Sequence, residues 1–338
     1  MSVSRIGLML GDVTGIGPET CAKLLAAGQV QKIARIVVVG DARVLELGMN
    51  DAGVSFPWRS YGRVEEIDWE RPEVPLIDLE NLNPADVPRG VVSAESGRVT
   101  GETLAHMTEL ALEGSLDAVT FAPLNKAALN AGGWRYPDEH QMFAKLTAHE
   151  GYFGEMNVLG NLWTSRVTSH IPLKQVAGLL TRERIVKAIK LAHHTLKAAG
   201  VSEPRLAVAA LNPHAGEGGL FGDEEGRIIG PAVEEAQQEG ISCSGPFPAD
   251  TIFLKAFTGH YDGVVSMYHD QGQIAMKLRG FNQGVTVTAG LRTVFTTPAH
   301  GTAFDIVGTG QAHTGALEQA LKLAGTLASS RRFFGSAA

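Results

Sequence analysis

The chain has 338 residues, enough for a sizeable core and two compact parts, because single domains commonly hold about 100–200 residues. Hydrophobic residues make up 44% of it and charged residues 19%, as in globular proteins, and no apolar run reaches the roughly 18–20 residues that span a bilayer. The net charge of −7 argues against a general nucleic-acid or anionic-membrane binder.

The sequence also carries signals about compartment. The N-terminal segment MSVSRIGLMLGD lacks the small-residue cleavage site of a secretory leader. Two cysteines, Cys21 and Cys243, are too few for a disulfide framework, and we expect both to be buried thiols. We therefore expect a cytoplasmic protein with a small-molecule substrate and neither a nucleic-acid nor a membrane partner.

Short β-branched runs alternate along the chain with stretches of helical spacing. The predicted strands are 6–10, 34–40, 117–123, 205–211, 261–269 (strand, then loop) and 284–290, and the predicted helices are 19–27, 99–113, 182–199 and 314–329. This alternation predicts an α/β fold with mostly parallel sheets and flanking helices. In such a fold, ligands bind in the loops at the carboxyl ends of the strands.

Three histidines lie in separate polar clusters: His170 in VTSHIPL, His214 in LNPHAGEGG and His269 in MYHDQG. Three neutral imidazoles leave open positions on a bound divalent metal, which a catalytic site needs. Asp250 in PADT is a candidate acidic partner, and Asp270 is a candidate acceptor for the ring of His269. We expect an extended backbone at His170, close to Ile-Pro.

Two glycine-rich segments and two lysines complete the candidate site. The segment GDVTGIGPE at 11–19 is a turn that opens a helix, and HGTAFDIVGTG at 300–310 is a backbone loop suited to a flat polar ligand such as adenosine. A lysine near a divalent metal gives up its proton more easily. Lys277, which follows His269, is therefore the preferred proton-transfer residue, with Lys126 as the second candidate.

These clusters, in this order, resemble the 4-hydroxythreonine-4-phosphate dehydrogenase family of vitamin B6 biosynthesis. The matching segments are GDVTGIGPE, FAPLNKAAL, SHIPL, LNPHAGEGG, GPFPADTIF, MYHDQG, KLRGF and HGTA. The resemblance implies a two-lobed fold like that of isocitrate and isopropylmalate dehydrogenases, with the active site in the interdomain cleft. It places a cofactor-side domain at 1–135 plus 275–338, and a metal and dimerisation domain at 136–274.

The resemblance also implies NAD as oxidant and a homodimer with a shared active site, with NADP left open. His170, His214 and His269 would bind the metal, one of them from the partner subunit. Zinc is the first expectation, with iron, cobalt, nickel, manganese or magnesium as alternatives. Lys277 and Asp250 would be the catalytic residues. The residues implied in binding NAD are Gly301, Thr302, Ala303 and Asp305.

The substrate-side positions depart from the family pattern. A His-Thr pair becomes His140 and Gln141, an asparagine becomes Thr286, and an arginine that holds the substrate phosphate becomes Phe295. Losing a charge-assisted anion contact costs roughly 1.5–3 kcal/mol per bond. Arg292 and Arg279 lie nearby in sequence and could compensate.

The resemblance implies an NAD- and metal-dependent oxidative decarboxylase of a β-hydroxy carboxylate, and from these departures we expect an unphosphorylated dihydrodiol substrate such as terephthalate 1,2-cis-dihydrodiol. The alternatives within the enzyme class are 4-hydroxythreonine-4-phosphate dehydrogenase and a dehydrogenase of phosphorylated four-carbon sugar acids. Two other classes stay open: a non-catalytic ligand-binding relative, and a metallohydrolase that binds no nucleotide.

Overall fold

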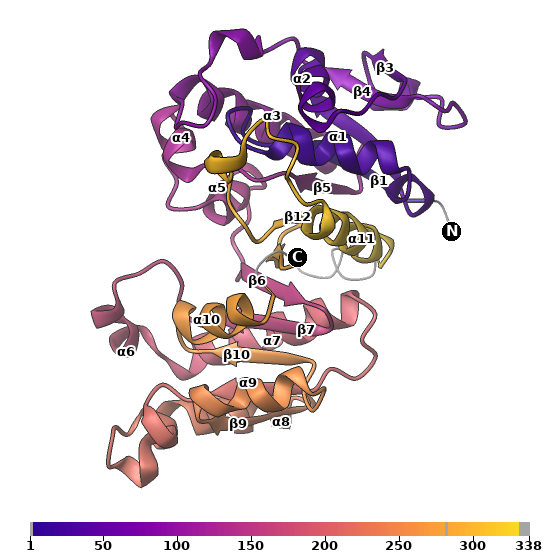
Figure 1. Ribbon diagram of the computed structural model, residues 1–338. Helices are drawn as coiled ribbons and strands as arrows, with labels where there is room; N and C mark the ends of the chain where they lie inside the picture. Colours follow the sequence, from indigo (N-terminus) through magenta and orange to yellow (C-terminus); the bar gives the residue numbers. More distant parts are fainter. Residues whose placement is uncertain (1–2, 281–282, 331–338) are drawn as a thin grey trace. The chain divides into compact units, whose positions relative to one another are not determined.

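The computed structural model describes residues 3–280 and 283–330 (Figure 1). The chain divides into two compact units: the first contains the chain up to Glu150 and again from Leu291, and the second is Gly151–Gly290. The predicted inserted part was 136–274, so both limits of the observed second unit lie further along the chain. The cofactor and metal roles that we expect of the two parts stay predictions.

The first unit is built on a parallel sheet. Its strands are β1 (Arg5–Met9), β2 (Arg35–Gly40), β3 (Trp58–Tyr61), β4 (Val74–Asp78), β5 (Ala118–Phe121) and β12 (Val294–Pro298), in the order β3-β4-β2-β1-β5-β12. Every neighbouring pair is parallel, with Met9 opposite Val39 on one side and Phe121 on the other. The loops that follow β1, β5 and β12 therefore leave the sheet at the same edge.

Helices flank this sheet, and local sequence explains where several of them begin. They are α1 (Gly17–Ala27), α2 (Ala42–Ala52), α3 (Ala94–Leu112), α4 (Lys126–Ala131), α5 (Glu139–Leu146) and α11 (Gly315–Ser329), with single 3₁₀ turns at Val30–Lys32, Val64–Glu66, Pro84–Asp86 and Phe304–Ile306. Side chains of Asp41 and Ser93 cap α2 and α3 by accepting backbone N–H bonds. Pro18 occupies the first turn of α1, where its missing N–H costs nothing.

The second unit has a mixed sheet. Its strands are β6 (Gly154–Leu159), β7 (Leu162–Arg166), β8 (Leu206–Ala209), β9 (Cys243–Phe247), β10 (Gly263–Ser266) and β11 (Val285–Ala289), in the order β11-β6-β7-β10-β8-β9. The pairs β11–β6 and β6–β7 are antiparallel and the others are parallel. As a result, β7 and β10 end at the same edge, from which the segments carrying His170 and His269 emerge.

In the described residues of the second unit, five helices accompany its sheet. They are α6 (Val176–Leu179), α7 (Arg182–Ala198), α8 (Gly230–Gln238), α9 (Ala249–Phe257) and α10 (His269–Gly280), joined by 3₁₀ turns at Leu173–Gln175 and Pro213–Gly219 and a π-helical turn at Glu225–Ile229. One hydrophobic cluster of this unit joins Ile252 and Phe253 of α9, Val264 of β10 and Met276 of α10. This packing fixes the two helices that carry Asp250, His269 and Lys277.

The predicted α/β class with a mostly parallel sheet and flanking helices is confirmed. Each predicted strand and helix overlaps an observed one, although 261–269 contains only a four-residue strand, Gly263–Ser266, and His269 already begins α10. The resemblance to isocitrate dehydrogenase in fold, and the cleft that it implied, stay predictions.

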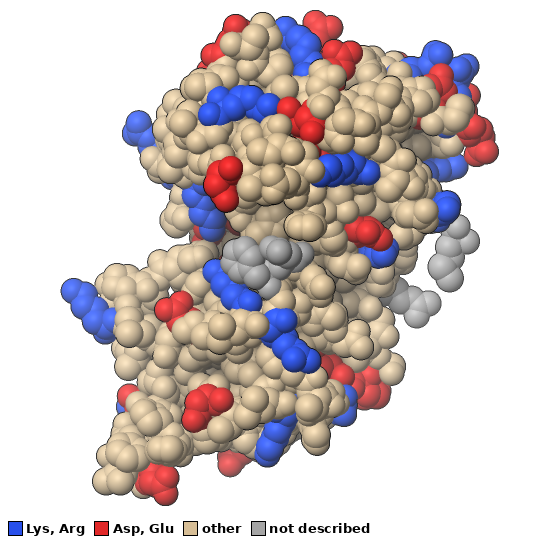
Figure 2. All heavy atoms as spheres, viewed as in Figure 1, with Lys and Arg blue, Asp and Glu red and all other residues tan. Residues whose placement is uncertain are grey.

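Helix length and surface charge bear on whether the protein has a membrane or nucleic-acid partner. Within residues 3–280 and 283–330, no helix is long and apolar enough to cross a membrane. On the face shown in Figure 2, Lys and Arg side chains are interspersed with Asp and Glu side chains. That pattern does not favour a nucleic-acid surface, which gathers basic side chains on one face.

Candidate functional site

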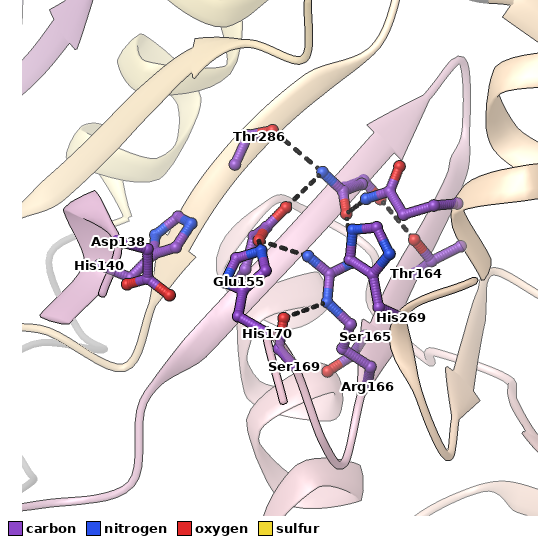
Figure 3. A network of polar contacts seen from close by, with 12 residues as sticks. Asp138, His140, Glu155, Thr164, Ser165, Arg166, Ser169, His170, His269 and Thr286 are labelled. Atoms are coloured by element: carbon purple, nitrogen blue, oxygen red, sulfur yellow. Dashed lines mark hydrogen bonds and ion pairs between the residues drawn. The ribbon is translucent and has the colours of Figure 1, made fainter. Parts of the chain in front are cut away.

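The edge of β6 and β7 carries a buried ion pair (Figure 3). Arg166, at the end of β7, is 3% exposed in its side chain, and its Nη2 contacts Oε2 of Glu155 on β6. Its Nη1 donates to Oδ1 of Asn157 at 2.9 Å, and its Nε donates to Oγ of Ser169 at 3.0 Å. A buried charge needs such partners, because an unpaired one costs several kcal/mol.

Asn157 joins this ion pair to two more elements. Its Nδ2 donates to Glu155 Oε1 at 3.1 Å and to Thr286 Oγ1 on β11 at 3.0 Å. Its Oδ1 accepts from Gln273 Nε2 on α10 at 2.5 Å. Thr286, a predicted substrate residue, is only 6% exposed. Its hydroxyl therefore belongs to a network that ties together β6, β7, β11 and α10.

Two of the three predicted metal-binding histidines lie beside this network. The ring centroids of His170 and His269 are 5.6 Å apart, and His170 Nε2 lies 4.0 Å from Glu155 Oε2. His269, the first residue of α10, has its Nδ1 2.7 Å from Oδ1 of Asp270. That bond leaves Nε2 as the nitrogen for a ligand, as we expected from the His-Asp sequence.

The extended backbone predicted at His170 is wrong. Its φ is +51°, in the left-handed region, which costs a non-glycine residue roughly 1–2 kcal/mol. The error has a simple reason: Pro172 restricts the residue directly before it, which is Ile171 and not His170. The strained turn directs the imidazole toward His269 (Figure 3).

The third histidine lies in an unusual turn. We call Pro213–Gly219 the His214 turn; six consecutive residues of it, 214–219, have positive φ. Glu225, only 6% exposed, holds the start of this turn: its Oε1 accepts the N–H groups of Leu211 at 2.8 Å and Asn212 at 2.7 Å. A Cβ on Gly216 would lie 2.7 Å from the carboxylate, so only glycine fits there.

The structure thus brings His170 and His269 together but does not group His214 with them. In the described part of the chain, no cluster of three or more His, Cys, Asp or Glu side chains is arranged to hold a metal ion. The elements are nevertheless neighbours, because α9 packs against both the His214 turn and α10. Two converging imidazoles are a donor set that suits zinc and similar metals.

The two predicted catalytic residues are both exposed. Asp250 lies in the first turn of α9, and Lys277 lies on α10 two turns after His269. Because a helix rises about 1.5 Å per residue, the backbones of His269 and Lys277 are about 12 Å apart. Their catalytic roles stay predictions.

The remaining predicted substrate residues belong to the first unit. His140 and Gln141 lie on α5; His140 is 4% exposed, whereas Gln141 is exposed and donates its backbone N–H to Asp138 Oδ1, which caps the helix. Phe295 on β12 is fully buried, and its ring stacks on Phe143 with a centroid distance of 3.9 Å. Its ring is therefore part of the core in this structure.

Arg292 and Arg279, the two predicted replacements for the missing family arginine, differ in their surroundings. Arg292 is exposed just before β12. Arg279, at the end of α10, places its guanidinium 5.7 Å from the ring centroid of Phe257. A cation over an aromatic ring is already partly stabilised there.

The predicted cofactor residues lie in one loop, 301–312, which we call the cofactor loop. Gly301 and Asp305 are exposed, Thr302 is 7% exposed, and Ala303 has a φ of +44°. The GIGPE turn supports the loop, because Ile16 N–H donates to Thr302 O at 3.0 Å. The two glycine-rich segments, almost 290 residues apart in sequence, therefore lie next to each other and are joined by a backbone hydrogen bond.

Sequence reasoning missed the residues that hold the reactive side chains in place. Arg166, Glu155, Asn157 and Glu225 were not singled out, because polar residues inside short strands or turns resemble surface positions. One available signal was the clustering of Glu155, Asn157 and Arg166 in two adjacent short strands.

Comparison with known proteins identifies the family. The family model described as Pyridoxal phosphate biosynthetic protein PdxA matches residues 32–324. The 4-hydroxythreonine-4-phosphate dehydrogenase of Geobacter metallireducens is 42% identical, covering 96% of this chain and 95% of the relative. The D-threonate 4-phosphate dehydrogenase of Salmonella typhimurium is 39% identical, covering 97% of this chain and 100% of the relative.

Solved structures agree. A 4-hydroxythreonine-4-phosphate dehydrogenase from Klebsiella pneumoniae superposes with a TM-score of 0.84 at 39% identity, covering 96% of this chain and 98% of the other. A terephthalate 1,2-cis-dihydrodiol dehydrogenase from Burkholderia xenovorans reaches 0.65 at 29% identity, covering 96% and 98%. The dihydrodiol substrate that we predicted is therefore wrong, and the phosphorylated four-carbon alternatives fit better. The chain belongs to the PdxA family.

Proposed function

We propose that this protein is an NAD-dependent dehydrogenase that oxidises the 3-hydroxyl of a four-carbon acid carrying a 4-phosphate. The observation that carries the proposal is the set of relatives at about 40% identity over nearly the whole chain, named for 4-hydroxythreonine 4-phosphate and D-threonate 4-phosphate. These two acids share the carboxylate, the 3-hydroxyl and the phosphate, and differ at carbon 2. Oxidation at carbon 3 gives a β-keto acid, which then loses CO₂ readily.

A divalent metal is part of this proposal. His170 and His269 supply two imidazoles, and His214 supplies the third, with one of the three coming from the second subunit of a homodimer. Such a metal, zinc or one of the alternatives named above, would polarise the hydroxyl and lower its pKa. The network of Arg166, Glu155 and Asn157 lies beside these two imidazoles, whose ring centroids are 5.6 Å apart.

The protein's own side chains then move the proton and hold the substrate. Hydride passes from carbon 3 to NAD, and after CO₂ leaves, Lys277 donates a proton to carbon 2 of the resulting enolate, with Asp250 assisting from α9. Both arginines are exposed, but the guanidinium of Arg279 already lies 5.7 Å from the ring centroid of Phe257, so Arg292 is the proposed cation for the phosphate. NAD binds along the cofactor loop through Gly301, Thr302, Ala303 and Asp305.

A homodimer is supported by apolar side chains on the surface of the second unit. Ile274 and Leu278, four residues apart on α10, are 59% and 85% exposed, and Leu254 on the adjacent α9 is 71% exposed. Apolar side chains gathered on one surface are typical of an interface. Replacing Leu278 with glutamate should shift the mass in light scattering from dimer toward monomer; a dimer that persists would remove this surface from the proposal.

The test is formation of NADH, followed by absorbance, with metal returned to chelator-treated protein. We expect turnover of 4-hydroxythreonine 4-phosphate or D-threonate 4-phosphate, and the ratio of their kcat/KM values assigns the substrate. Arg292→Ala should raise KM for the phosphorylated acid about tenfold, with Arg279→Ala as the matched control. No NADH with either acid, in protein that binds metal, would refute the proposal.

A further inference from the structure

The cofactor loop is fastened at two places, to the residue that precedes α1 and to α1 itself. At its start, Ile16 N–H donates to Thr302 O at 3.0 Å. Thr302 lies so close to Gly15 that a Cβ there would be 2.8 Å from the threonine Cβ. At the far end, Glu19 Oε1 accepts the N–H of Ala312 at 2.8 Å.

A lysine completes the second attachment. Lys23, one turn after Glu19 on α1, donates from Nζ to Gly310 O at 2.7 Å and to Ala312 O at 3.0 Å. The same Nζ lies 2.8 Å from Glu19 Oε1. Glu19 is only 1% exposed and the Lys23 side chain 22% exposed, so solvent weakens this pair far less than it weakens a surface pair.

The segment between the two attachments is open. Asp305, Gly308 and Thr309 are exposed, and Ala303 has a left-handed backbone. A loop of this kind loses conformational entropy when a ligand orders it, and the ligand then binds more weakly. Holding both ends removes part of that cost before the ligand arrives.

We propose that Glu19 and Lys23 are positioning residues for NAD: they preset the cofactor loop by fastening residues 310–312 to α1. This inference rests on the proposed function, which assigns NAD to this loop. In this proposal Glu19, the glutamate of the GIGPE turn, affects NAD binding indirectly, by holding the backbone of the cofactor loop. The glutamate and the lysine do not themselves touch NAD.

The test is the dissociation constant of NAD, measured by calorimetry on the full-length protein. Glu19→Gln keeps an acceptor for Ala312 but loses the charge that holds Lys23, and Lys23→Met loses both carbonyl bonds. We expect about tenfold weaker NAD binding in each variant, because one or two charge-assisted bonds no longer order the loop. Glu318→Gln is the matched control, since Glu318 and Lys322 form the same i,i+4 pair on α11, with their charged atoms 2.6 Å apart.

Further measurements separate positioning from a general loss of stability. In both variants KM for NAD should rise about tenfold while kcat at saturating NAD stays within about twofold. Hydrogen exchange, measured without NAD, should become faster selectively in residues 301–312. NAD binding within twofold of the unmodified protein in folded Lys23→Met, or exchange that rises equally across the first unit, would overturn the inference. Unmodified protein that binds no NAD would refute the cofactor assignment itself, and this inference with it.

Discussion

Replacing Glu225 with alanine should loosen the His214 turn. Glu225 Oε1 accepts two backbone N–H bonds, from Leu211 and Asn212, inside a nearly buried site. Hydrogen bonds to a charged group contribute roughly 1.5–3 kcal/mol each. Because the turn itself is exposed and water can enter, the lower value applies, and the two bonds together contribute about 3 kcal/mol. Opening of this segment should then be about a hundredfold more frequent, since 1.4 kcal/mol is a factor of ten.

Hydrogen exchange measured by mass spectrometry reports this change directly. A peptide covering residues 211–219 should lose about two powers of ten in protection. Glu224→Gln is the control, because within the described residues Glu224 accepts its hydrogen bond from the side chain of Asn212, at 2.7 Å, and not from a backbone N–H. Metal affinity should also fall by about 10–100-fold in Glu225→Ala, as for other residues that orient a ligand. Unchanged protection of the turn, or equal loss across the second unit, would show that Glu225 does not hold it.

Three further predictions follow from burial. Phe295→Ala should lower the free energy of unfolding by roughly 3–5 kcal/mol in urea, because it removes a fully buried ring stacked on Phe143; a loss below about 1 kcal/mol would contradict the core role. Burial raises the pKa of the Cys21 thiol far above its usual range and that of Cys243 to about 11, so neither should react with an aromatic disulfide reagent at about pH 8 until the protein unfolds. Burial lowers the pKa of His193 and of His194 below the usual histidine value of about 6.5, so the unfolded chain binds more protons and stability should fall as pH drops below about 6.5. Between about pH 7.5 and 5.5, the urea midpoint of unfolding should fall less in the double variant His193→Gln/His194→Gln than in the unmodified protein. An equal fall in the two proteins would contradict this account.

The fold was predictable wherever apolar periodicity was strong. The runs at 34–40 and 182–199 gave β2 and α7 with errors of one residue or none at each end, because their side chains pack against other elements in a regular pattern. The strands β6 and β7 were missed because Glu155, Asn157 and Arg166 interrupt the apolar pattern. The charges of Glu155 and Arg166 are paired only once β6 and β7 lie side by side, and the apolar pattern of the sequence does not show that pairing.

The candidate site was predictable as a set of residues but not as a geometry. The His-Asp sequence correctly indicated that Asp270 holds Nδ1 of His269, since adjacent residues need no long-range information. The convergence of His170 and His269 depends on β7 and β10 ending at one edge of the sheet. The left-handed backbone of the His214 turn depends on contacts such as that of Glu225 with Leu211 and Asn212, which lie 14 and 13 residues away in sequence.

The substrate prediction rested on three departures, at Gln141, Thr286 and Phe295, and the loss of the arginine at Phe295 was given too much weight. The loss of the family arginine at Phe295 removes roughly 1.5–3 kcal/mol per bond, which a single well-placed cation elsewhere can restore. The structure also gives Phe295 a packing reason, because its ring stacks on Phe143, and Phe121 meets Phe143 edge-on at 5.6 Å. Because Phe295 fills an aromatic core, its presence does not indicate whether the substrate carries a phosphate. The substrate is better judged from the cations that remain exposed, of which Arg292 is the first to test.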